Sequence, residues 1–119
     1  IMVININTTK KKYFRQALEV VKSLPPLDTL RNKQLDMLAE LLYYNYKYKA
    51  IPEELRWKIL FDYDTKMEMA DNLGYSEDYI NGMISMLRGK NIIKGKTLTS
   101  TFNIDPDNPI IQFNFKIED

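Results

Sequence analysis

The chain of 119 residues contains no cysteine and no histidine. The absence of cysteine excludes disulfides, thiolate metal sites and cysteine nucleophiles. The absence of histidine removes the usual general base and the commonest metal ligand, so Ser-His-Asp chemistry and zinc sites are excluded. The best remaining catalytic candidates are Asp62, Asp64 and Glu68, whose simpler interpretation is helix capping and surface charge. We therefore expect a binding or assembly protein without a metal or cofactor, and not an enzyme.

Long apolar runs are also missing, so we expect no membrane span. Lys10, Lys11 and Lys12 follow a short strand-like start with no apolar segment after them, which is unlike a signal peptide. With 45% hydrophobic residues, the chain is long enough for one folded domain over residues 1–119. Ile, Asn and Lys are abundant while Ala is scarce, a bias typical of AT-rich genomes, including many phages. We expect the protein in the cytoplasm of a bacterial host or in a virion.

The chain has almost no excess of either charge, because its net charge is +1. The basic and acidic residues are nevertheless distributed unevenly along it. Residues 1–50 carry nine basic and four acidic side chains, whereas residues 51–119 carry eight and twelve. Residues 51–87 alone carry three basic and eight acidic side chains. Such patterning often reflects solvated faces. Here it bears on function, because the acidic stretch holds the most specific motif and is followed by a basic cluster, Arg88, Lys90, Lys94 and Lys96.

Apolar periodicity and capping residues predict five helices. The first follows a cap at Asn7 or Thr8 and ends before Pro25 and Pro26. The second has Asn32 as its cap and reaches about Tyr48. The others are expected from Pro52 to about Phe61, from a Thr65–Glu68 capping box to Gly74, and from a Ser76 cap to Gly89.

Four tyrosines crowd the last turns of the second predicted helix. They cannot all face one core, so we expect any exposed member to anchor a partner protein. The alternative is ordinary packing in the core and at its rim. The four residues are Tyr43, Tyr44, Tyr46 and Tyr48.

Alternating apolar residues predict strands towards both ends of the chain. Residues 2–6 alternate, and residues 111–117 place Ile111, Phe113, Phe115 and Ile117 on one side. These two strands are expected to pair with each other. Further strands are expected from residue 91 to 94 and near 98–104, with turns at Gly95 and at 105–109.

Residues 66–85, KMEMADNLGYSEDYINGMIS, have the spacing of a helix-turn-helix. Ala70 supplies the small residue where the helices cross, Gly74 supplies the turn, and Ile80 and Met83 fix the second helix to the first. The following segment, LRGKNIIKGKTLTSTFNI, is similar to the end of a recognition helix with a wing. The chain resembles winged helices of the MarR and plasmid or phage replication-initiator types over about residues 30–104.

This resemblance implies an α+β, mainly helical fold. It would be a winged helix-turn-helix with an N-terminal helix and a small antiparallel C-terminal sheet. The helix-turn-helix would occupy about residues 66–88, and the wing and tail strands about residues 91–117. The wing would be either the Gly95 turn or the acidic Pro106–Pro109 turn. The alternative is a generic helical hairpin with a β-tail.

The resemblance also implies binding to double-stranded DNA. The helix after Ser76 would enter the major groove, with Asn81 and Ser85 on bases or phosphates. The basic cluster would hold phosphates beside the groove through Arg88, Lys90, Lys94 and Lys96, and a second contact would come from Lys10, Lys11 and Lys12.

Glu77 and Asp78 oppose the DNA interpretation, because they would face phosphates. Their simpler interpretation is stabilisation of the positive end of the helix dipole. The alternative function is a structural subunit of a phage virion, of the ring or connector type, in which the same fold packs against other protein subunits. Glu77, Asp78 and the four tyrosines would then lie at interfaces. With either function we expect an oligomer or part of a larger assembly.

Overall fold

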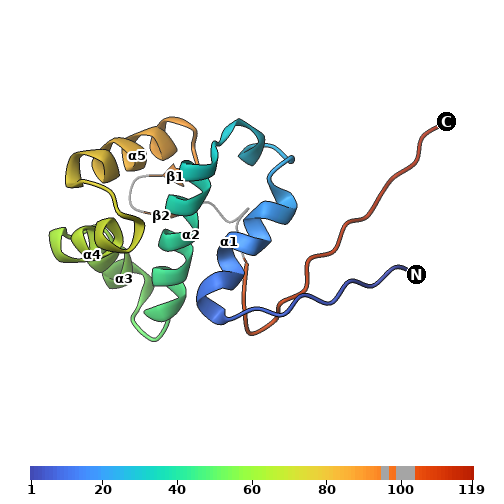
Figure 1. The fold of residues 1–119 in the computed structure, drawn as a ribbon, viewed down its shortest axis with the longest axis horizontal. Coiled ribbons are helices and arrows are strands. Elements are labelled where there is room, and N and C mark those ends of the chain that lie inside the picture. The colour runs from blue at the N-terminus through green and yellow to red at the C-terminus, as the bar shows by residue number, and fades with distance from the viewer. Residues whose placement is uncertain (95–96, 99–103) are drawn as a thin grey trace.

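The structure, a computed structural model, describes residues 1–94, 97–98 and 104–119. This part of the chain is mainly helical (Figure 1). Within it lie five α-helices, as the sequence predicts, together with one 3₁₀ turn and two short strands. Their bounds are α1 (Lys10–Val21), η1 (Leu27–Thr29), α2 (Asn32–Lys47), α3 (Glu53–Leu60), α4 (Tyr63–Leu73), α5 (Glu77–Gly89), β1 (Ile93–Lys94) and β2 (Thr97–Leu98).

Helix α2 lies at the centre of the fold and packs against α1, α3, α4 and α5. Most of the apolar residues expected to face the core of these helices are buried, whereas Val21, Ile59 and Leu73 are half-buried and Leu55 is exposed. Burial of such side chains is the main stabilising contribution, because each removes apolar surface from water. The buried set includes Phe14, Ala17 and Leu18 of α1, Leu35, Leu38, Leu41 and Leu42 of α2, and Ile80, Met83, Ile84 and Leu87 of α5.

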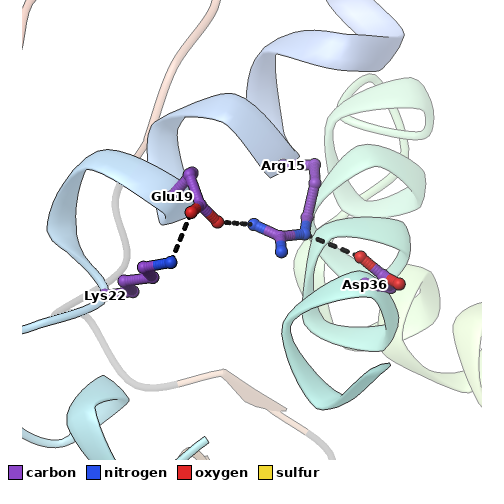
Figure 2. A network of polar contacts seen from close by, with 4 residues as sticks. All are labelled: Arg15, Glu19, Lys22 and Asp36. Carbon is purple, nitrogen blue, oxygen red and sulfur yellow. Dashed lines mark hydrogen bonds and ion pairs between the residues drawn. The ribbon is translucent and has the colours of Figure 1, made fainter. Parts of the chain in front are cut away.

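A polar network joins α1 to α2 at the edge of this core (Figure 2). The Arg15 guanidinium donates through Nε to Asp36 Oδ1 at 2.7 Å and through Nη1 to Glu19 Oε2 at 2.8 Å. Lys22 pairs with the other oxygen of Glu19. One arginine therefore binds a carboxylate of its own helix and one of α2. The side chains remain partly exposed, so the network adds orientation more than stability.

The predicted start of the first helix is wrong by one or two residues. Thr9, not Asn7 or Thr8, accepts the capping hydrogen bond, from the Lys12 backbone N–H at 3.2 Å. Asn32 is likewise the first residue of α2 and not its cap, because Arg31 occupies that position. At the end of α2 the prediction is confirmed, since Tyr48 is the C-terminal cap.

The predicted capping box at Thr65 and Glu68 is also wrong. Asp62 caps α4, because its carboxylate accepts from the Thr65 backbone N–H at 2.8 Å. The helix thus begins one turn earlier, and Glu68 is left to bind Tyr44 of α2 instead. The Gly74 turn and the Ser76 cap are confirmed.

The sheet described by the structure is two residues long in each strand. β1 and β2 pair antiparallel, with Ile93 opposite Leu98 and Lys94 opposite Thr97. The predicted Gly95 turn and the centre of the predicted strand near 98–104 lie outside the described residues. Ile92 and Ile93 are buried against the helices, so this part of the chain belongs to the domain.

The two terminal strands predicted over residues 2–6 and 111–117 do not form. Both segments lie without strand pairing and extend away from the helical body (Figure 1). Alternation in the sequence gives a segment one apolar side, but a strand also needs a neighbouring backbone with which to form hydrogen bonds. Beside these segments the body presents helices, so within the described residues no sheet edge of matching length meets them.

Candidate functional site

The α4–α5 pair was the predicted DNA-reading element, and its turn has the expected geometry. Gly74 has φ +72°, the left-handed region, and the following Tyr75 N–H returns to the Ala70 carbonyl at 2.9 Å. Ala70 is completely buried. A Cβ built at Gly74 would meet nothing within 4 Å, so glycine is needed there for its backbone conformation and not for space.

The first turn of α5 is acidic where it reaches solvent. The Ser76 side chain accepts from the Tyr79 backbone N–H at 3.2 Å, and Glu77 and Asp78 follow directly. These carboxylates stabilise the positive end of the helix dipole. Asn81, the predicted base-reading residue, is half-buried and its amide oxygen accepts from Lys66 Nζ at 3.1 Å. Of the two residues of α5 predicted to contact DNA, Asn81 and Ser85, Ser85 alone is exposed as that interpretation requires.

The side of α5 that faces α2 is hollow and partly apolar. A groove of about 240 Å³ runs beside Gly82 between these helices. A surface of this kind suits a protein side chain better than a phosphate backbone. Its lining residues are Gln34, Asp78, Tyr79, Gly82, Met83 and Met86.

The basic cluster after α5 is dispersed by packing. The Arg88 guanidinium lies over the Phe61 ring, with Cζ 5.5 Å from the ring centroid. Lys90 Nζ donates to the Thr29 carbonyl of η1 at 2.8 Å, which fixes the end of α5 to the loop before α2. Lys94 is exposed on β1, and Lys96 lies outside the described residues. The predicted phosphate-binding surface is thus split between two neighbouring elements.

The lysines at the start of α1 lie on the other side of the domain. Figure 1 shows α1 and α5 on opposite sides of α2, so the two basic groups do not form one surface. Lys10 Nζ is 3.8 Å from Asp107 Oδ1, and Lys11 Nζ lies 5.5 Å from the centre of the Tyr43 ring. Lys12 is exposed near them. The predicted second DNA contact therefore does not adjoin the first.

The four tyrosines pack in the core and at its rim, as the alternative interpretation predicted. Tyr44 is 1% exposed, so the prediction that it anchors a partner is wrong. Its hydroxyl donates to Glu68 Oε1 at 2.7 Å and accepts from Asn72 Nδ2 at 3.0 Å, which joins α2 to α4. Burial, and then the Glu68 carboxylate, raise the pKa of Tyr44. The other three tyrosines are half-buried, and the rings of Tyr43 and Tyr46 pack against Phe14.

Asp107 fixes the start of the C-terminal segment to the helical body, which the sequence did not reveal. Tyr46 donates to Asp107 Oδ1 at 2.9 Å, and Lys49 Nζ donates to Oδ2 at 2.6 Å. The Asp107 backbone N–H in turn binds the Asp105 side chain at 2.9 Å, which shapes the turn. This turn, one candidate for the wing, is therefore docked on the ends of α1 and α2. The Asp-Pro-Asp sequence was a signal for a tight turn but not for its docking site.

Beyond this contact, the two ends of the chain form apolar arms, the most unusual feature of the surface. We define the N-terminal arm as residues 1–9 and the C-terminal arm as residues 110–119. Met2 is 85% exposed, Phe115 88% and Ile117 86%. Monomeric proteins rarely expose contiguous apolar surface of this kind. The large exposed apolar residues of the arms are Ile1, Met2, Val3, Ile4, Ile6, Ile110, Ile111, Phe113, Phe115 and Ile117.

Among the described residues, no group of three or more side chains could hold a metal ion. No described helix is long and apolar enough to cross a bilayer. Comparisons with protein-family models, with curated proteins and with solved structures found no match to this chain.

Proposed function

We propose that the chain is an assembly module, a winged helix-turn-helix-type domain that binds other protein subunits through its apolar arms. The observation that carries the proposal is the exposure of ten large apolar side chains on two terminal segments. Each such side chain contributes about 1.5–3 kcal/mol when it is moved out of water. Exposed apolar side chains in such number on two short segments favour association with protein.

Support for the fold type comes from α4, α5 and the short hairpin that follows them. The left-handed Gly74, the buried Ala70 and the Ser76 cap fit a helix-turn-helix. β1 and β2 follow α5 at the place of a wing. Such a fold does not decide function, because the same architecture serves different partners. The acidic first turn of α5 and the groove beside Gly82 favour a protein partner over a DNA backbone.

An experiment in the organism that produces the chain tests this function. The tagged full chain should sediment in a particle much larger than its 14.1 kDa monomer. An arm variant with serine at Ile4, Phe115 and Ile117 should sediment as the monomer. The matched control replaces three exposed apolar residues of the body by serine, and should behave as the wild type. These three residues are Val20, Leu24 and Leu55, which are 49%, 46% and 52% exposed.

Two results would overturn the assembly function. The first is an arm variant that sediments with the wild type, because the arms would then carry no association. The second is a nuclease treatment that returns the wild type to the monomer position, because DNA would then hold the particle together. Circular dichroism of both variants checks that the helices are intact.

DNA binding is the second candidate, and it is favoured by the exposed side chains of Arg88 and Lys94 after α5. Phosphate contacts make binding salt-dependent, with a slope of about −0.9 in log K against log salt per contact. Replacing both residues by glutamate should abolish binding to duplex DNA or reduce its salt dependence. The control replaces Lys22 and Lys116 by glutamate, which changes the net charge equally. No salt-sensitive binding by the wild type at low ionic strength would exclude this candidate.

A further inference from the structure

The order of apolar and polar residues in the C-terminal arm is symmetric, and no contact with the described part of the helical body accounts for this symmetry. Residues 111–117 read Ile-Gln-Phe-Asn-Phe-Lys-Ile, so the apolar pattern is the same in both directions about Asn114. An antiparallel strand that pairs with a copy of itself needs such a pattern, because each residue meets one at the mirrored position. Residues 111–117 carry one charge, on Lys116, and the symmetric register places Lys116 opposite the neutral Gln112 of the second copy, so like charges do not face each other.

The geometry of the arm separates an apolar side from a polar side. Gln112 Nε2 donates to Asn114 Oδ1 at 3.0 Å, which places these two side chains together. Of the alternating apolar residues, Ile111 and Phe113 are 37% and 46% exposed, and the outer Phe115 and Ile117 are 88% and 86% exposed. Within the described residues, no hydrogen bond joins the backbone of residues 111–117 to the body. The arm thus presents one free apolar side and free backbone donors and acceptors.

The body of the same chain offers no suitable partner strand in its described part. β1 and β2 are two residues long, whereas the arm has seven residues of alternating pattern. Short, uncharged segments with high β-propensity associate with each other when they are exposed. The root of the arm is fixed by Asp107 on Tyr46 and Lys49, so the arm leaves the body in a set direction. A two-fold partner would meet it with an identical arm.

We propose that the C-terminal arms of two copies of this chain pair as antiparallel β-strands centred on Asn114. This proposal rests on the assembly function and names its first partner as a second copy. In this register Phe113 lies opposite Phe115 of the second copy, and Ile111 lies opposite Ile117 of the second copy. All four apolar residues then meet apolar residues, and aromatic cross-strand pairs stabilise the sheet. A shift by one residue would place the apolar side of one strand against the polar side of the other.

Because the chain contains no cysteine, single introduced cysteines report this register directly. In Asn114→Cys the introduced cysteines of the two copies lie opposite each other, with Cα atoms about 4.5–5.5 Å apart, which allows a disulfide. In Gln112→Cys the two residues are displaced by four positions, about 14 Å along the strand, and cannot be bridged. Both positions are exposed and polar, so they form a matched pair.

Mild oxidation of the full chain at about micromolar concentration should convert most of Asn114→Cys, and little of Gln112→Cys, to a covalent dimer. A mixture of Gln112→Cys with Lys116→Cys should form the mixed dimer. Sedimentation velocity should show a wild-type dimer that Phe115→Lys weakens at least tenfold, while Val20→Lys on the body leaves it unchanged.

Equal crosslinking of the two cysteine variants would overturn the proposed register, because it would show random collision. A wild type that stays monomeric, together with an Asn114→Cys variant that does not crosslink, would overturn the second copy as partner. If that wild type still enters a large particle in the native extract, and the arm variant does not, the assembly function stands with a different protein as partner. If the second copy is excluded in this way and the wild type also enters no large particle in the native extract, the assembly function fails as well.

Discussion

The hydroxyl of Tyr46 donates a hydrogen bond of 2.9 Å to the carboxylate of Asp107, which lies 61 residues further along the chain. The other carboxylate oxygen accepts from Lys49 at 2.6 Å. This contact joins the end of α2 to the root of the C-terminal arm. It gives an exposed segment a defined origin on a helical body, and so sets the direction in which the arm leaves.

The hydrogen bond from Lys49, followed by that from Tyr46, holds the pKa of Asp107 below its ordinary value of 3.8. We predict that Lys49→Ala raises the titration midpoint of the Asp107 carboxyl, measured by NMR. The control is Lys47→Ala, which removes a lysine near Glu68 instead. Because the folded-state pKa is depressed, the contact stabilises the docked turn above the unfolded pKa and is lost as pH falls through the folded pKa. An unchanged midpoint in Lys49→Ala would contradict the contact.

Two glycines of the α4–α5 pair should respond in opposite directions to alanine. Gly74→Ala places a Cβ in the left-handed region and should lower the free energy of unfolding by about 1–2 kcal/mol. Gly82→Ala lies inside α5 with open space around the added Cβ, and should raise that free energy by about 0.5–1 kcal/mol. Urea denaturation measures both. Equal effects of the two substitutions would show that the turn at Gly74 is not left-handed in solution.

The Arg15 network and the core beside it should differ sharply in their contribution to stability. Asp36→Ala removes a partly exposed ion pair and should cost about 0–1 kcal/mol. Leu38→Ala opens a cavity in the centre of α2 and should cost about 2–5 kcal/mol. The same urea titration compares them. A larger loss in Asp36→Ala than in Leu38→Ala would mean that the polar network, and not the core, holds α1 in place.

The helices could be predicted from the sequence because their signals are local. Leu35, Leu38 and Leu42 recur at helical spacing, and Gly74 ends a helix by its own backbone preference. Each of these signals lies within a few residues of the helix or helix end that it specifies. The exact start of α4 is not fixed by such a pattern, because several neighbouring residues can supply a capping oxygen, and Asp62 rather than Thr65 does so.

The terminal strands and the site contacts could not be predicted in the same way. Alternation at Phe113 and Phe115 describes one side of a segment but not the neighbour that a strand requires. The contacts of Tyr46 with Asp107 and of Tyr44 with Glu68 join distant parts of the chain through single side chains. No periodic pattern records such contacts. The charges of α5 were visible in the sequence, but the pairing of Asn81 with Lys66 was not.

The buried hydroxyl of Tyr44 provides a last test of how α4 is held on α2. Tyr44→Phe keeps the ring but removes the hydroxyl that Glu68 and Asn72 share, and should cost about 1 kcal/mol of unfolding free energy. Tyr43→Phe is the control, because its ring contacts with Phe14 and Tyr44 are retained and little change is expected. Spectrophotometric titration should also show one tyrosine that ionises well above the usual pH range in the wild type, since burial and Glu68 raise the pKa of Tyr44. Loss of that late titration in Tyr44→Phe, together with its persistence in Tyr43→Phe, would assign it. A Tyr44→Phe variant as stable as the wild type would show that apolar packing alone holds the two helices together.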